Sequence, residues 1–258
     1  MDPATIIGLV LAFAGVSASV MLEGGSPAVL LAPAALVLIF VGTAGACLAG
    51  TTLPGAIGAM KWLMAGFTAK RPDMEGVVEP LVKMAEKARR EGLLALESEM
   101  DSVEDDFMRR GLQMAVDGTD PDDLFDILAA EVKATKTSSA AAASFWTDAG
   151  GYSPTIGIIG TVFGLIHVLE NLSEPDKLGH LIAAAFIATL WGVLSANVMF
   201  LPWGKRIKAV GMAEAARMEL IIDGVLAIQA GANPRVVQTK LRSKMPSEGP
   251  APAAKEAA

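Results

Sequence analysis

Four long stretches without a charged residue constrain this chain more than any other feature. They cover residues 4–22, 24–60, 149–166 and 181–204. A helix needs about 20 mostly apolar residues to cross the hydrocarbon core of a bilayer, so each stretch is long enough for one span. Charged residues make up only 19% of the 258-residue chain, too few for an ordinary soluble domain. The sequence therefore predicts a membrane protein with four transmembrane helices.

The segment between the second and third stretches is predicted to be a water-facing helical domain. Residues 61–150 hold 11 Lys/Arg and 18 Asp/Glu, and this net charge of −7 equals that of the whole chain. Asp120 and Pro121 form a helix-start signal, as cap and first helical residue. Apolar residues repeat at three and four positions, as one buried helix face requires: Val77, Val78, Leu81, Met84, Ala85 and Ala88.

The expected organisation is all-α. Pro54 and the small residues around it favour a single second span over roughly residues 28–49. After the fourth span a helical pattern continues until Gly231. We expect transmembrane helices 1 and 2 in 1–60, a cytoplasmic helical domain in 61–148, transmembrane helices 3 and 4 in 149–204, a cytoplasmic C-terminal helix in 205–245 and a disordered tail in 246–258.

The distribution of basic residues predicts the topology. Lys and Arg follow the second and fourth stretches and precede the third, whereas the two short connections, residues 23–27 and 170–180, hold one Lys and several acids. Cytoplasmic flanks carry the excess of positive charge. Both termini and the middle segment are therefore expected in the cytoplasm.

The sequence contains no pattern typical of an enzyme. Its two histidines, His167 and His180, lack metal-ligand partners at helical spacing, and phosphate loops and nucleophile motifs are absent. Nothing indicates a resident cofactor or nucleic-acid binding. The single cysteine, Cys47, lies within the second span and is expected to be a buried structural thiol.

Small and polar residues form matching stripes on the third and fourth predicted spans. On a helix, one stripe contains Pro154, Gly157, Thr161 and Gly164, and the other contains Ala185, Thr189, Gly192 and Ala196. Such stripes pack helices closely in lipid, and the alternative is that the threonine oxygens line a hydrated path. Neither span contains a carboxylate, although a cation in hydrocarbon needs a negative or strongly polar site. A conducting complex would thus take its acid from another chain.

Residues 86–111, "EKARREGLLALESEMDSVEDDFMRRG", are rich in charges of both signs. A solvated helix face is the usual meaning of such a pattern. A docking surface steered by both signs of charge is the alternative.

Several motifs in this order resemble motility protein A, called MotA, or PomA in sodium-driven forms. They are "LEGGSPAVLLAPAALVLIFVGTAGACLAG", "KARREGLLALE", "SPTIGIIGTVFGLI", "LPWGKRIK" and "MELIIDGVLAIQAGANPRVV". The resemblance runs from about residue 4 to residue 242. It implies an ion-conducting stator subunit of the flagellar motor, in which five copies surround two copies of a single-span motility protein B that supplies the ion-binding aspartate.

The resemblance also implies roles for individual residues. Pro154 and Pro202 match prolines at the cytoplasmic ends of spans three and four, and Thr161 and Thr189 match polar positions facing the ion path. A charged pair that meets the rotor protein FliG matches the residues Arg89 and Glu97, with Arg90 an equally basic neighbour.

The resemblance leaves the transported ion, H⁺ or Na⁺, open. Thr161 is typical of sodium-type relatives, but Leu31 stands where some of these carry an acid. Two other functions are weighed. One is an energiser of outer-membrane processes similar to ExbB or TolQ, whose members typically have three spans. The other is a four-span scaffold that conducts nothing.

Overall fold

The computed structural model describes residues 4–69 and 73–245, in which every regular element is a helix and no strand occurs. The predicted disordered tail, residues 246–258, lies outside the described residues. The chain divides into two compact units. The first takes its described residues from Met1–Arg71 and Thr137–Met212, and the second from Pro72–Lys136 and Ala213–Ala258. The predicted all-α class is confirmed, although the second unit also includes a C-terminal part of the chain and begins later than residue 61.

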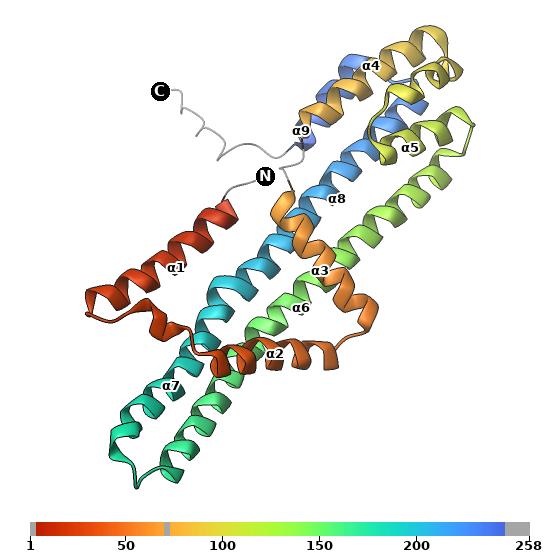
Figure 1. Ribbon diagram of the computed structural model, residues 1–258. Coiled ribbons are helices and arrows are strands. Elements are labelled where there is room, and N and C mark those ends of the chain that lie inside the picture. The colour runs from red at the N-terminus through yellow and green to blue at the C-terminus, as the bar shows by residue number, and fades with distance from the viewer. Residues whose placement is uncertain (1–3, 70–72, 246–258) are drawn as a thin grey trace, which may run out of the picture. The chain divides into compact units, whose positions relative to one another are not determined.

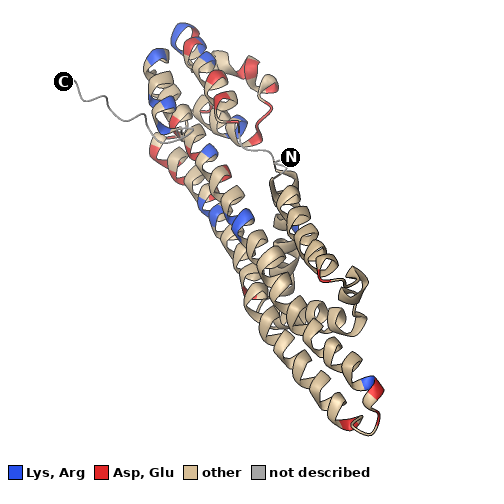
Figure 2. Cartoon of the chain, turned by 90° about the vertical axis from the view of Figure 1, so that its left-hand side faces the viewer, with Lys and Arg blue, Asp and Glu red and all other residues tan. Residues whose placement is uncertain are grey.

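The first unit is the apolar one: Figure 2 shows long helical stretches without charged residues, with charges at the turn between α6 and α7 and a basic group, Lys205, Arg206 and Lys208, early in α8. Its elements are α1 (Ala4–Leu22), a 3₁₀ turn η1 (Pro27–Leu30), α2 (Pro33–Ala49), α3 (Leu53–Thr68), the later part of α6 (Pro121–Glu170), α7 (Pro175–Leu194), a π-helical segment η3 (Ser195–Phe200) and the start of α8 (Leu201–Gln229). The helix α2 packs against α7, and α1 buries none of its residues (Figure 1).

Within residues 4–69 and 73–245, three helical stretches are long and apolar enough to cross a membrane: α1, α6, and the run from α7 through α8. The helix α2 is shorter, with 17 residues, because Pro33 begins it and residues Pro27–Leu30 form a separate turn. The stretch expected as the second span, roughly residues 28–49, is thus not one continuous helix. Since 17 residues lie at the lower limit for a span, the number of four spans stays a prediction.

An aromatic cluster joins α6 to the start of α8 in this unit. The Trp146 ring lies 5.1 Å from Trp203 and 6.1 Å from Phe200, measured between ring centroids. Its indole N–H donates to the Ala59 carbonyl at 3.1 Å, which satisfies the polar end of a buried ring. Cys47 is buried beside these residues, as expected of a structural thiol.

The second unit is a charged helical domain. It contains α4 (Glu75–Glu91), a 3₁₀ segment η2 (Leu93–Ser102), α5 (Asp106–Val116), the first part of α6, the last part of α8, and α9 (Pro234–Lys244). The helix α4 packs against η2 and α9, and η2 packs against α5. Its core is mainly aliphatic, and the largest side chains that are almost completely buried are Leu81, Leu96, Leu112, Leu124, Leu128, Ile221, Ile228 and Leu241.

The ends of the helices follow local sequence signals. Asp120 caps α6 through the Asp122 backbone N–H at 2.9 Å, and Pro121 is its first residue, as predicted. The C-terminal helix expected over 205–245 is two helices in the structure. Gly231 adopts a φ of +66°, which favours glycine, and α8 ends just before it; Asn233 then caps α9.

Candidate functional site

The helices α6 and α7 pack so closely that backbone atoms of one helix lie next to backbone atoms of the other. We call this contact the α6–α7 seam. It comprises Gly157, Thr161, Gly164, Ala185, Thr189 and Gly192. A Cβ atom on Gly192 would lie 2.7 Å from the Ser153 carbonyl oxygen, and one on Gly157 would lie 3.0 Å from the Ala188 carbonyl oxygen. Only glycine fits at such separations. The two stripes seen in the sequence therefore pack against each other within one chain.

The hydroxyl groups of Thr161 and Thr189 lie at the centre of this seam. They contact each other, and each also lies close to the Gly157 carbonyl oxygen, at 3.2 Å and 3.3 Å. Thr161 is also 3.2 Å from the Ala185 carbonyl oxygen. Each hydroxyl has one proton, so the two protons are shared among more acceptors than they can satisfy together. Lone pairs of oxygen therefore remain available at this point of the seam.

Two further hydroxyls, those of Ser153 and Ser195, join α6 to the segment after α7. Both side chains are fully buried, their oxygens are 2.7 Å apart, and Ser153 donates to the Gly192 carbonyl at 3.0 Å. Ser153 directly precedes Pro154, and Ser195 opens the π-helical segment. This contact was missed in the sequence because isolated serines in an apolar helix have no distinguishing pattern.

The two prolines lie within helical runs. Pro154 is inside α6, and Pro202 is the second residue of α8, directly after the π-helical segment. A proline cannot donate to the preceding turn and its ring displaces the carbonyl there. The run widens into a π helix just before Pro202, over Ser195–Phe200, and the Leu201 N–H donates to the Ala196 carbonyl. Such π turns are frequent at functional sites in helices.

The seam supplies oxygen ligands but no charge. Hydroxyl and carbonyl oxygens can hold a cation or a chain of water molecules, yet the apolar runs 149–166 and 181–204 contain no carboxylate. Among the described residues, no group of three or more His, Cys, Asp or Glu side chains is placed to hold a metal ion. A cation held in hydrocarbon would need a negative or strongly polar site in addition to these oxygens.

The predicted rotor-contact residues lie in the second unit. They are Arg89, Arg90 and Glu97, and we call them together the charged surface. Arg89 and Arg90 occupy the last turn of α4, and Glu97 lies in η2. All three are exposed, and none forms an ion pair or side-chain hydrogen bond with the residues that the structure describes.

Gly92 separates the two arginines from Glu97. Its backbone has φ +86° and ψ 164°, a region open essentially to glycine alone. The eight-residue spacing of Arg89 and Glu97 therefore does not lie on one solvated helix face. The glycine after a basic last turn is a helix-stop signal, and it could have revealed this break.

Neighbouring charges on the same elements are paired. The Lys87 ammonium donates to Glu99 at 2.7 Å and to the Ser98 hydroxyl at 2.9 Å. The hydrogen bond and the charge of Lys87 hold the pKa of Glu99 below its ordinary value. The charged stretch thus contains paired residues and also residues without an ion pair among those that the structure describes.

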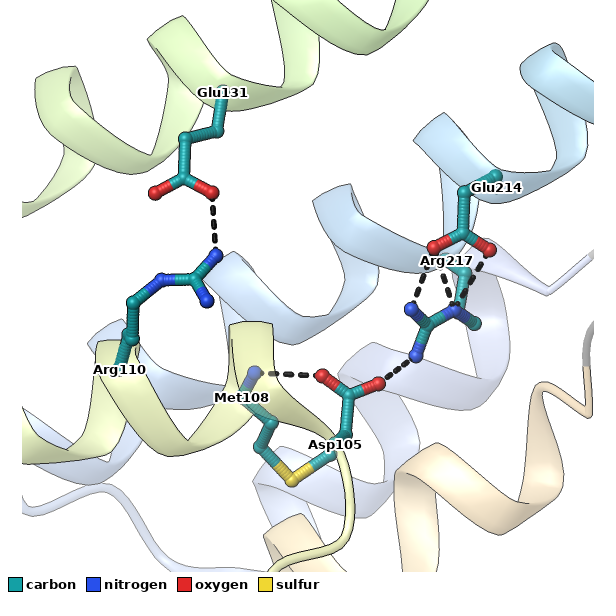
Figure 3. A network of polar contacts seen from close by, with 6 residues as sticks. All are labelled: Asp105, Met108, Arg110, Glu131, Glu214 and Arg217. Atoms are coloured by element: carbon teal, nitrogen blue, oxygen red, sulfur yellow. Dashed lines mark hydrogen bonds and ion pairs between the residues drawn. The ribbon is translucent and has the colours of Figure 1, made fainter. Parts of the chain in front are cut away.

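A second ionic network fixes the start of α5 (Figure 3). Arg217 on α8 contacts Glu214 through two nitrogens and reaches Asp105, the residue that caps α5 by accepting from the Met108 N–H at 2.8 Å. Burial raises the pKa of Asp105, but the hydrogen bonds from Met108 and Arg217 outweigh it and lower that pKa overall. Arg110 and Glu131 form a separate pair at 2.6 Å.

Comparisons with known proteins agree with this architecture. Residues 99–220 match the MotA/TolQ/ExbB proton channel family. The chain is 36% identical to motility protein A of Bacillus subtilis (strain 168), over 96% of this chain and 92% of that protein. It is also similar to a solved structure of C. jejuni MotAB, with a TM-score of 0.92 and 32% identity over 97% of this chain and 98% of that one.

The flagellar MotAB stator complex from Bacillus subtilis is a second similar structure, with a TM-score of 0.88 and 36% identity over 95% of this chain and 96% of that one. These relatives match along nearly the whole chain and are motility protein A or MotAB proteins, which decides against the ExbB-like energiser. The chain belongs to the MotA/TolQ/ExbB proton channel family, within its motility protein A branch, whose members are flagellar stator subunits and not enzymes.

Proposed function

We propose that this chain forms an ion-conducting stator together with a single-span subunit of the motility protein B type, and that ion flow through the complex generates torque on the rotor. The observation that carries this proposal is the similarity to two MotAB structures over almost the full length of both chains. No resident cofactor takes part. The transported ion is H⁺ or Na⁺.

The ion path would pass the α6–α7 seam. Thr161 and Thr189 supply oxygen ligands there, and the partner's transmembrane aspartate would supply the missing negative charge. Pro154 and Pro202 would lie at the inner mouth. Each interrupts the hydrogen bonding of a helical run, so a change of charge nearby can alter the bend of that run at low cost.

The charged surface would meet the rotor protein FliG. Arg89, Arg90 and Glu97 are exposed and unpaired among the described residues, as a surface that recognises charges on a partner requires. Charge reversal there would weaken torque without closing the ion path.

The proposed assembly is a homopentamer in the bacterial inner membrane, with both termini in the cytoplasm. The uncharged α1 and the exposed apolar side chains of α6 and α7 support contact with lipid and with neighbouring copies. The charged second unit would then lie in the cytoplasm, where positively charged flanks are expected.

The decisive test of the rotor contact compares swimming with ion flux. The variant with Arg89→Glu and Arg90→Glu together should lose swimming, while membrane insertion and flux survive. Arg235→Glu, a reversal of an exposed arginine on α9, is the matched control and should swim normally. Full swimming of the double variant would refute the docking role.

A second test concerns the ion. Swimming speed measured against sodium concentration, with a proton uncoupler as control, separates a sodium-driven from a proton-driven motor. Thr161→Ala should lower flux in the complex, and so should removal of the partner's aspartate. Flux that survives both changes would exclude the proposed path.

A further inference from the structure

The η2 segment carries Glu97 on a backbone that is weak by itself. It has ten residues in 3₁₀ conformation, whereas 3₁₀ runs longer than three or four residues are uncommon because their hydrogen bonds are poorly aligned. Leu96 and Met100 anchor one side of it in the core. Glu97, between them, projects from a segment whose position depends on side-chain contacts.

Lys87 connects this segment to α4 across the break at Gly92. It lies on α4, one turn or less before Arg89 and Arg90, and its ammonium reaches Ser98 and Glu99, the two residues directly after Glu97. The Lys87–Glu99 bridge therefore joins the element that carries the two arginines to the element that carries the glutamate.

Lys87 and Glu99 differ from the charged surface in exposure and in partners. Their side chains are 21% and 29% exposed and neutralise each other, whereas Arg89, Arg90 and Glu97 are exposed and unpaired among the described residues. A charge that already has a close partner contributes little to attraction of a distant surface.

We infer that Lys87 and Glu99 are positioning residues, which fix Glu97 relative to Arg89 and Arg90 and do not themselves contact the rotor. This inference rests on the proposed rotor contact. It divides one charged stretch into residues that dock and residues that set the spacing of the docking charges.

Charge exchange separates the two roles. Lys87→Glu and Glu99→Lys should each lose swimming, because each places two like charges together. The double exchange rebuilds the pair with opposite polarity and should restore swimming to most of the original speed. If either residue contacted the rotor, the exchange would present two reversed charges and swim no better than the worse single variant, which would overturn the inference.

Matched controls exclude an effect of charge alone. Glu104→Lys and Lys133→Glu make the same changes at exposed sites of the same unit and should swim normally. Membrane levels of every variant are measured by immunoblot. Lys87→Arg, which keeps the charge and the reach, should also keep swimming, while Lys87→Met should not.

A distance measurement tests the positioning without the rotor. Spin labels at Glu91→Cys and Asp101→Cys, both exposed and on opposite sides of the break, should give a narrow distance distribution in the full complex. The distribution should broaden with Lys87→Met or Glu99→Gln and narrow again with the double exchange. An unchanged distribution would overturn the inference.

Failure of the rotor contact gives a different result. In that case reversal of Arg89 and Arg90 leaves swimming intact, and the single exchanges at Lys87 and Glu99 broaden the distance distribution without affecting swimming. The positioning of Glu97 would then stand, and its role in torque would be refuted.

Discussion

Thr161 and Thr189 contact each other through their hydroxyl groups and share the Gly157 carbonyl oxygen. The two threonines therefore form one connected polar group at this point of the α6–α7 seam. A substitution at either residue should therefore alter the hydrogen bonds of the other, so paired substitutions can test the contact.

Replacement of each threonine by valine should remove hydrogen bonding at nearly constant volume. We expect Thr161→Val and Thr189→Val each to destabilise the detergent-solubilised complex by about 0.5–1 kcal/mol. Because the two hydroxyls share partners, the double variant should lose less than the sum. Thermal unfolding of the four proteins measures this, and strict additivity would show that the hydroxyls act independently.

Added volume at the seam should separate α6 from α7. Gly192→Ala places a methyl group 2.7 Å from a backbone oxygen, which should cost about 2 kcal/mol and reduce assembly with the partner. Gly151→Ala is the control in α6, since a Cβ there meets nothing within 4 Å. Assembly is read by co-purification, and equal yields of the two variants would contradict the close packing.

Loss of Arg217 should destabilise the second unit. Arg217→Met leaves Asp105 and Glu214 without their shared partner at a site where the arginine and Asp105 side chains are 19% and 21% exposed. We expect a cost of about 2 kcal/mol, measured by thermal unfolding. Arg109→Met breaks an exposed pair with Asp106 and should change stability little. Equal effects would show that the network in Figure 3 adds nothing.

The charge of Asp105 should make part of this stability depend on pH. Its pKa is lowered from an ordinary value of 3.8, so the stabilisation is fully present above that value and is lost as the pH falls through the folded-state pKa. The difference in melting temperature between the wild type and Asp105→Asn, which keeps the cap acceptor, should be constant near neutral pH and shrink below pH 3.8. A difference that grows on acidification would reverse the assigned sign.

Much of the architecture follows from one-dimensional patterns. Uncharged runs predict apolar helices, and periodicity predicts the buried face that contains Leu81 and Met84. Asp120 and Pro121 mark the start of α6 because a cap acts over a few neighbouring residues. Such signals are local, so a sequence is enough to find them.

Contacts between distant residues could not be predicted in this way. The pairing of Ser153 with Ser195 depends on how α6 approaches α7, and that depends on several glycines together. Similarly, Lys87 pairs with Glu99 and not with Glu97, because the chain changes direction at Gly92. The sequence shows a cluster of charges, but only the fold decides which of them are satisfied.

The most direct test of the central claim is the rotation of single tethered cells that lack their own stator and express this chain with its motility protein B-type partner. Torque should rise in discrete steps as complexes are incorporated, and it should stop when the driving ion gradient is collapsed. Complexes that assemble in the membrane but produce no rotation in any ion gradient would contradict the claim.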